Sequence, residues 1–329
     1  MTLSLPTADD LTRACDRLRP VVCRTPLLES STLNAALGAR VLVKAEALQH
    51  TGSFKFRGAY YRLSCLDERQ RTAGVIAFSS GNFGRALAAA GSLLAIPVTI
   101  VMPVDAPRMK IDATRKCGAE VVLSEHGTRN REEAASELAA NLARERGATL
   151  LHPFDDPLIV AGQGTTAVEM LEQIKQKQCA FDSLLVPVGG GGLISGCALA
   201  FANASSATEI YGVEPEGYDG MGRSIAVGKR ARADGDRETL CDALQAVMPG
   251  EVPFRVARDR LKGAVAVADE PVRAAMALAF TELKIVLEPS GAIALGALLS
   301  GGLEIAGKCV GVVASGGNVA VERFKELVA

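Results

Sequence analysis

The chain has 329 residues and a nearly balanced charge, with 36 basic and 37 acidic side chains. A chain of this length can bury a large core, and its 48% hydrophobic and 22% charged residues exclude an intrinsically disordered protein. The lack of a basic excess and of tryptophan, with only 4% aromatic residues, argues against nucleic acid as a partner.

Neither the beginning of the chain nor its uncharged segments predict a membrane protein. The first residues lack the basic start and apolar stretch of a signal peptide, and they predict a capped helix. Ala86 to Val104 carries no charge, but Gly91, Pro97 and Pro103 interrupt it, which favours a buried helix followed by a strand. The widely spaced cysteines include no C-x-x-C pair and are expected to be reduced. We therefore expect a cytoplasmic protein with no membrane partner.

Along the chain, short apolar runs rich in β-branched residues alternate with alanine-rich stretches of helical length. The runs predict strands at Val41–Val43, Val75–Phe78, Val98–Val101, Glu120–Leu123, Ser183–Val188, Glu209–Val213 and Cys309–Val313. The stretches between them predict helices at Arg85–Leu94, Arg131–Glu145, Thr166–Gln176 and Val272–Lys284. This alternation predicts an α/β fold with parallel sheets covered on both faces, whose ligands lie at the carboxyl ends of the strands.

A lysine between two phenylalanines opens a predicted helix. Ser53 is predicted as its N-cap, and Lys55 then lies in the first turn beside Phe54 and Phe56. The positive end of a helix and apolar neighbours both lower the pKa of a lysine, which prepares its amine for Schiff-base chemistry. Taken alone, the pattern is more often that of a solvated helix lysine.

Small polar residues follow two other predicted strands. Ser79, Ser80, Gly81 and Asn82 come after the strand at Val75–Phe78, where hydroxyls and an amide at a helix start suit a carboxylate. A helix cap and a turn is the alternative interpretation. A second polar loop, from Ser315 to Asn318, follows the last predicted strand, and again a plain turn is the alternative.

Four consecutive glycines form the most specific motif. Gly189, Gly190, Gly191 and Gly192 follow the strand at Ser183–Val188 and open a predicted helix. Residues without a Cβ let successive N–H groups turn toward one point, and the helix N-terminus adds partial positive charge. We therefore predict a phosphate cradle here instead of a flexible turn. The G-x-G-x-x-G register fails at every alignment of these glycines, which argues against a dehydrogenase.

Together these motifs resemble those of the fold-type II pyridoxal-phosphate enzymes, specifically the threonine/serine dehydratase and serine racemase family. The similar stretches are Ser53–Ala59, Ser79–Asn82, His152–Pro157, Ala161–Thr165, Gly189–Gly192, Val213–Gly217, Glu288–Ala292 and Ser315–Asn318. The resemblance implies a two-domain α/β fold similar to the β subunit of tryptophan synthase. Residues 1–71 and 152–329 would form the large domain, residues 72–151 the small domain, and the cofactor would lie between them.

The resemblance also implies a role for each motif around pyridoxal 5′-phosphate. Lys55 would carry the cofactor as a Schiff base and later take the Cα proton of the substrate. The glycines would hold the phosphate, Asn82 would bond the ring hydroxyl, and Ser315 would bond the pyridine nitrogen. A neutral serine stabilises a protonated ring poorly, which suits rapid expulsion of a β-leaving group more than long-lived carbanion chemistry.

Substrate contacts follow from the same resemblance. Ser79, Ser80, Asn82 and the backbone near Phe83 would receive the substrate carboxylate. Ser80 also aligns with the residue that serves racemases as the acid/base on the opposite face, and Glu288 lies on a loop that would approach the ring. Phe83 is a departure, because family members usually carry histidine after the asparagine, so any imidazole role is lost.

A divalent cation site is expected to be empty or weak. Such a site in the family usually combines Glu214, a backbone carbonyl and a carboxylate six residues further on. Here that last position is Gly220, with Asp219 one residue earlier. Since these cations prefer several oxygen ligands with carboxylates among them, we expect no metal and little dependence on added Mg²⁺.

The function implied by the resemblance is α,β-elimination of an L-3-hydroxy amino acid, which gives a 2-oxo acid and ammonia. An amino-acid racemase similar to serine racemase is the alternative, and a non-catalytic protein that binds the cofactor is a third interpretation. The partner is expected to be a small amino acid, and the protein a homodimer or a higher homo-oligomer. No C-terminal regulatory domain is expected after Ala329. Threonine, serine, 3-hydroxyaspartate and phenylserine all stay open as substrates.

Overall fold

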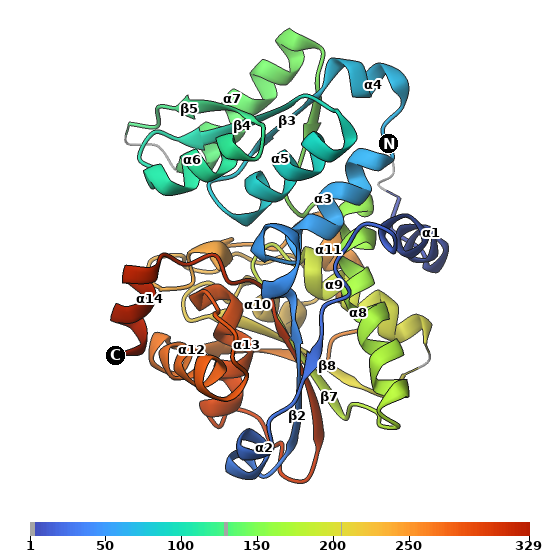
Figure 1. The fold of residues 1–329 in the computed structure, drawn as a ribbon, viewed down its shortest axis with the longest axis vertical. Coiled ribbons are helices and arrows are strands. Elements are labelled where there is room, and N and C mark those ends of the chain that lie inside the picture. The colour runs from blue at the N-terminus through green and yellow to red at the C-terminus, as the bar shows by residue number, and fades with distance from the viewer. Residues whose placement is uncertain (1–3, 128–130, 205) are drawn as a thin grey trace.

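The computed structural model describes residues 4–127, 131–204 and 206–329, which form two lobes, each built on its own sheet (Figure 1). The larger sheet has the strand order β1–β2–β10–β7–β8–β9, and the smaller sheet has the order β5–β4–β3–β6. Neighbouring strands pair in parallel, apart from the antiparallel pair β1–β2. The strands are β1 (Leu27–Leu28), β2 (Arg40–Ala45), β3 (Val75–Phe78), β4 (Val98–Pro103), β5 (Glu120–Ser124), β6 (Thr149–Leu151), β7 (Ser183–Pro187), β8 (Glu209–Pro215), β9 (Gly263–Val267) and β10 (Cys309–Ala314).

Helices surround both sheets and confirm the predicted α/β fold. They are α1 (Ala8–Leu18), α2 (Ser31–Leu37), α3 (Lys55–Ser64), α4 (Glu68–Ala73), α5 (Asn82–Leu94), α6 (Arg108–Lys116), α7 (Arg131–Arg146), α8 (Pro157–Gln176), α9 (Gly192–Asn203), α10 (Gly220–Val227), α11 (Glu251–Ala257), α12 (Asp269–Glu282), α13 (Pro289–Leu299) and α14 (Val321–Val328). Three short 3₁₀ turns are η1 (Glu46–Leu48), η2 (His50–Gly52) and η3 (Asp242–Leu244). Among the described residues, no helix is both long enough and apolar enough to cross a membrane.

The larger sheet is buried on both faces. In β2, Val41 and Val43 belong to one core with α12 and α13, while Leu42 belongs to a second core with α8 and α9. Side chains of a strand alternate between its two faces, so an uninterrupted apolar run fills both cores at once. This explains why the predicted strands of this sheet are continuous apolar runs without polar alternation.

The smaller sheet is covered in the same way. Ile76 and Val101 pack with α7, whereas Val75, Ala77 and Ile100 pack on the other face with α3 and α5. Every strand predicted from the sequence is present in one of the two sheets. The strands that the sequence analysis missed, β1, β6 and β9, all lie at sheet edges, where part of each strand is exposed and the apolar pattern is weaker.

The connection after β2 leads to the contact between the lobes. β2 leads through η1 and η2 into α3, which lies between the lobes and packs against both α5 and α8 (Figure 1). β10 and β2 end level with each other, because Ala314 pairs with Ala45. The domain boundaries at residues 71–72 and 151–152 remain a prediction, and α4 crosses the first of them.

Candidate functional site

The Lys55 and Ser315 segments are joined to each other directly. Ser53 and Gly316 form an antiparallel bridge, and the backbone N–H of Phe54 donates to the carbonyl of Ser315 over 3.1 Å. The chain therefore holds two of the predicted site segments together, although they are far apart in the sequence.

Lys55 is the first residue of α3 and points into apolar surroundings. Its Nζ lies 5.1 Å from the ring centroid of Phe54 and 5.9 Å from that of Phe83. The one hydrogen bond of Nζ in the described structure is donated to the carbonyl of Pro153, over 3.3 Å. Burial lowers the pKa of Lys55 to about 8, because no carboxylate compensates for the lost hydration of the ammonium form. A lysine of this kind is available as an amine near neutral pH.

The predicted N-cap role of Ser53 is wrong. Phe54 occupies the cap position of α3 and makes no side-chain cap bond, while Ser53, one residue earlier, pairs with Gly316. The hydroxyls of Ser53 and Thr51 are instead buried without a hydrogen-bond partner in the described part of the chain. Buried hydroxyls without partners are costly, so two of them beside Lys55 fit a site that a polar ligand completes.

The glycine loop has the geometry of an anion cradle. It links β7 to α9, and Gly191 at the helix cap has a φ of +93°, which favours glycine. A Cβ on Gly190 would lie 2.3 Å from the ring of Phe154, so only glycine lets this loop pack there. Within residues 4–127, 131–204 and 206–329, no protein group accepts from the backbone N–H groups of Gly189 to Gly192. A phosphate at the positive end of α9 fits these donors.

The serine loop before α5 is also built to donate. The Ser79 Oγ accepts from the backbone N–H groups of Gly81, over 3.3 Å, and Gly84, over 3.1 Å. Its own O–H is then left to donate outward. Gly81 caps α5 without a side-chain bond, and Ser80 Oγ has no hydrogen bond within the described residues. The loop thus offers hydroxyls and a helix N-terminus to one anionic group, as the carboxylate interpretation requires.

Asn82 and Glu288 contact each other beside the Ser315 loop. The Asn82 amide donates to Glu288 Oε1 over 2.5 Å. A Cβ on Gly316 would lie 2.2 Å from the same oxygen, so Glu288 packs directly on the backbone beside Ser315. Burial raises the pKa of Glu288 to about 8, which the hydrogen bond from Asn82 only partly offsets. Ser315 Oγ donates to the carbonyl of Ser290 over a long 3.4 Å.

A buried ion cluster around Arg57, two residues after Lys55 on α3, was not predicted. We give this name to Lys44, Glu46, Arg57 and Glu169. Arg57 pairs with both glutamates at 2.8 Å, and Lys44 pairs with Glu169 at 2.7 Å. Lys44, Glu46 and Arg57 are fully buried. The cluster ties α3 to η1 and α8, which fixes the helix that Lys55 begins. The sequence signal that could have indicated this cluster is Lys44, a lysine inside the otherwise apolar strand β2.

In the region where the family usually holds a cation, the Glu214 carboxylate is bonded by the protein itself. Both Glu214 oxygens accept backbone N–H groups, from Met221 over 2.8 Å and from Gly222 over 2.9 Å. Asp219 instead pairs with Arg223 at 3.0 Å. The described residues contain no cluster of three or more histidine, cysteine or acidic side chains that could hold a metal. Glu214 therefore acts in this structure as a cap of α10.

His152 holds a turn together. Its Nδ1 accepts from the backbone N–H of Asp155 over 2.9 Å. Asp155 in turn accepts from the backbone of Glu251 and Val252 at the start of α11. These bonds hold the turn that carries Pro153 and Phe154 against Lys55 and the glycine loop.

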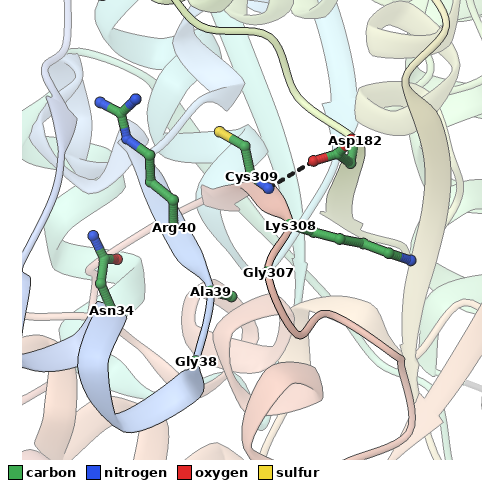
Figure 2. A pocket seen from close by; sticks show the side chains of 8 residues that line it. All are labelled: Asn34, Gly38, Ala39, Arg40, Asp182, Gly307, Lys308 and Cys309. Atoms are coloured by element: carbon green, nitrogen blue, oxygen red, sulfur yellow. Dashed lines mark hydrogen bonds between the residues drawn. The ribbon is translucent and has the colours of Figure 1, made fainter.

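An open cavity of about 450 Å³ lies elsewhere and contains none of the predicted site residues. Its lining residues surround the amino ends of β2 and β10, and include Arg40, Asp182 and Lys308 (Figure 2). Asp182 there accepts from the backbone N–H of Cys309 over 2.7 Å. Since ligands of parallel sheets bind at the carboxyl ends of the strands, this cavity lies at the opposite end from the expected chemistry.

The chain is similar to known proteins over nearly its whole length. Residues 18–316 match the family described as "Pyridoxal-phosphate dependent enzyme". The chain is 41% identical to an L-threo-3-hydroxyaspartate ammonia-lyase from Pseudomonas sp, over 99% of both chains. It is 38% identical to a serine racemase from Schizosaccharomyces pombe, over 98% of this chain and 97% of that protein.

Two solved structures show the same fold. A threonine deaminase from T.th. superposes with a TM-score of 0.89 and 40% identity, covering 96% of this chain and 99% of that one. The serine racemase of maize superposes with a TM-score of 0.90 and 34% identity, covering 98% of this chain and 97% of that one. The similarity therefore extends over both lobes and the site between them.

Proposed function

Because this chain belongs to the family of pyridoxal-phosphate dependent enzymes, we propose that it is an ammonia-lyase acting on an L-3-hydroxy amino acid. Loss of the Cα proton and the Cβ hydroxyl as water, followed by hydrolysis of the released enamine, yields a 2-oxo acid and ammonia. Pyridoxal 5′-phosphate, when bound, supplies the electron sink that makes the Cα proton acidic. The observation that carries this proposal is Lys55, an amine with a lowered pKa that lies near two phenyl rings and bonds to the turn packed against the glycine loop.

Lys55 is proposed as both the attachment point and the base. Its Nζ has no carboxylate partner in the described structure, so no counter-charge stabilises the protonated form, which lacks the reactive lone pair. Held at the start of α3 by the ion cluster, the amine has a fixed position from which to take a proton at Cα.

The remaining predicted residues have roles that match their donors and acceptors. The N–H groups of Gly189 to Gly192 would hold the cofactor phosphate, Asn82 its ring hydroxyl, and Ser315 its ring nitrogen. The loop of Ser79, Ser80 and Asn82, with the backbone at Phe83, would orient the substrate carboxylate. These donors would hold the two anionic ends, and would thereby fix the position of the reacting Cα–H bond relative to Lys55.

A substrate with a 3-hydroxyl group is supported by the relatives. Both the Pseudomonas sp and the Saccharomyces cerevisiae relatives, at 41% and 40% identity, are described as L-threo-3-hydroxyaspartate ammonia-lyases. A relative from Thermotoga maritima, at 37% identity, is described as an L-threonine ammonia-lyase. L-threo-3-hydroxyaspartate is therefore the first substrate to test, followed by L-threonine, L-serine and phenylserine.

The deciding experiment measures 2-oxo acid release from these four amino acids by the purified holoenzyme. We expect release from at least one, with L-threo-3-hydroxyaspartate the fastest. The Lys55→Ala variant, prepared in the same way, is the matched control and should release none. If the wild-type protein forms no 2-oxo acid from any of the four, the proposed ammonia-lyase function is wrong.

A racemase is the second candidate. Among the described residues, the Ser80 hydroxyl has no hydrogen-bond partner, and it lies on the loop proposed to hold the carboxylate. A serine hydroxyl is a poor proton donor unless its surroundings tune it, so we expect 2-oxo acid formation to exceed D-amino acid formation. Chiral analysis of the products from L-serine measures the ratio. A product that is mainly D-serine, and that a Ser80→Ala change abolishes, would reverse the order of the two candidates.

A further inference from the structure

A chain of four polar side chains crosses between the lobes beside the candidate site. Arg85 donates from NH1 to Asn318 Oδ1 over 2.8 Å. Asn318 Nδ2 donates to Asn82 Oδ1 over 2.7 Å, and Asn82 Nδ2 donates to Glu288 Oε1 over 2.5 Å. We call this chain the amide relay. Arg85 and Asn82 lie on α5, whereas Asn318 and Glu288 belong to the lobe of the larger sheet.

The relay has one direction, which its first member sets. A guanidinium group carries only donors, so the Asn318 atom that faces Arg85 is the amide oxygen. The opposite end of the same amide donates to the carbonyl of Thr51 over 2.8 Å, which agrees with this orientation. Asn82 must then turn its oxygen to Asn318 and its NH₂ group toward Glu288 and the site.

The relay lies close to the backbone at two glycines. A Cβ on Gly52 would lie 2.5 Å from Asn318 Oδ1, and a Cβ on Gly316 would lie 3.3 Å from Asn82 Nδ2. Gly52 precedes the Lys55 segment, and Gly316 follows Ser315. The amides are thus held between the two segments that contain the proposed Schiff-base lysine and the ring-nitrogen partner.

The contacts of Arg85 do not satisfy all of its own hydrogen-bond donors. Its Nε is buried and has no acceptor among the described residues, although its NH1 is bonded. A buried N–H without an acceptor destabilises the fold, so a purely stabilising role would not favour an arginine here. Its charge also acts on Glu288, together with the charges of Lys110 and Asp242.

We propose that Arg85 is a positioning residue, which orients the amides of Asn318 and Asn82 so that Asn82 presents its NH₂ group to the ring hydroxyl of the bound cofactor. This inference rests on the proposed function, since it takes Asn82 as a partner of pyridoxal 5′-phosphate. Arg85 acts only through Asn318 and makes no contact with the reacting atoms.

The test compares Arg85→Gln, Arg85→Lys and Arg146→Gln holoenzymes with the wild type. Arg146 is the control, because it also lies in the lobe of the smaller sheet but pairs with Glu120 at the surface. The pH midpoint of the cofactor's visible absorption band, kcat, KM and the melting temperature are measured. For Arg85→Gln we expect the midpoint to shift by about 0.5–1 pH unit and kcat to fall about tenfold, with KM changed by less than about twofold.

Arg85→Lys should recover part of both effects, because it keeps a charged donor, and Arg146→Gln should show neither. An Arg85→Gln protein with a lower melting temperature but an unshifted band would mean that Arg85 is merely structural, and the proposal would be wrong. The band titration needs no substrate, so it tests the relay even if the wild type releases no 2-oxo acid.

A second variant tests the direction of the relay independently. Asn318→Asp keeps the side-chain volume and strengthens the pairing with Arg85, but replaces the donor to Asn82 by an acceptor. We expect a larger band shift than in Arg85→Gln, because the Asn82 amide must turn its oxygen toward the site. A wild-type band in Asn318→Asp would overturn the assigned orientation.

Discussion

Two lysines of this molecule, Lys44 and Lys55, have opposite surroundings. In the ion cluster, Lys44 donates to Glu169, to Gln173 and to the carbonyl of Thr25, at 2.7, 3.1 and 2.8 Å. In the site, Lys55 has one long bond to a carbonyl and two phenyl rings nearby. Burial lowers the pKa of both lysines, but the carboxylates of Glu46 and Glu169 offset part of this effect at Lys44, whereas no described group offsets it at Lys55.

The glutamates repeat this contrast. Glu46 accepts two hydrogen bonds from Arg57 and one from Thr25, and these groups hold its pKa below the ordinary value despite complete burial. Glu288 accepts a single bond from the neutral amide of Asn82, and burial raises its pKa to about 8. In the ion cluster, paired charges hold the side chains in fixed positions. Lys55 and Glu288, in the candidate site, have no charged partner at hydrogen-bond distance within the described part of the chain, and such groups suit the proposed holding or moving of a proton.

The largest effect is expected from removing the unpaired lysine. Lys55→Ala should lower the turnover of the best substrate by at least about 10³-fold, because both the attachment point and the base are lost. Because the loss of Lys55 leaves no buried charge without its counter-charge, the melting temperature should change little. Borohydride reduction of the wild-type holoenzyme followed by peptide mapping should place the label on Lys55. A label on Lys44 or Lys110 would contradict the assignment.

Breaking the paired cluster should act on stability instead. Arg57→Met leaves Glu46 and Glu169 without their guanidinium partner, and should lower the free energy of unfolding by about 3–5 kcal/mol in urea titrations. Arg146→Met, which breaks an exposed pair with Glu120, is the control and should cost at most about 1 kcal/mol. Equal losses in the two variants would mean that burial does not distinguish the two pairs.

The unpaired acid should make stability depend on pH. The folded-state pKa of Glu288 is about 8 against an ordinary 4.5, so its neutral form contributes stability fully below pH 4.5, and this contribution is lost as the pH rises through 8. Glu288→Gln should therefore unfold with a flatter pH dependence between pH 5 and about 8, measured after cofactor removal. Glu214, whose pKa burial raises to about 7, titrates in both proteins and cancels in the difference.

The smallest effect is expected from a chelator. The carboxylate of Glu214, the position that the family usually uses as a cation ligand, is already bonded to two backbone N–H groups of α10. Activity after chelator treatment should therefore stay within about twofold of the untreated enzyme. Loss of activity that Mg²⁺ restores would show that this loop rearranges, with Asp219 as the first ligand to test.

The sequence predicts the motifs of the candidate site, but it does not predict the ion cluster. The glycine loop, the Lys55 motif and the serine loop are each contiguous, so local chemistry reveals them. The ion cluster combines residues from β2, η1, α3 and α8, and nothing local marks Glu46 or Glu169 as buried. The relay from Arg85 to Glu288 is hidden for the same reason.

The N-cap prediction at Ser53 failed because of a contact that is distant in sequence. Locally, a serine before a helix start is a good cap, and the rule gave the correct beginning of α3 within one residue or so. Here Ser53 pairs with Gly316, and within the described residues its hydroxyl accepts no hydrogen bond from the first turn of α3. Tertiary contact overrides local preference most at positions where two segments of a site join.

The place of β10 in the larger sheet has a consequence for how the molecule is made. β10 lies between β2 and β7, so the strand that leads to Lys55 has no parallel neighbour until one of the last segments of the chain is inserted. Pairings between segments so far apart in sequence form late in folding. During synthesis on the ribosome, Lys55 would therefore emerge early yet wait for residues 309–316 before its surroundings exist. Capture of the cofactor should accordingly mark the completion of folding of the whole chain.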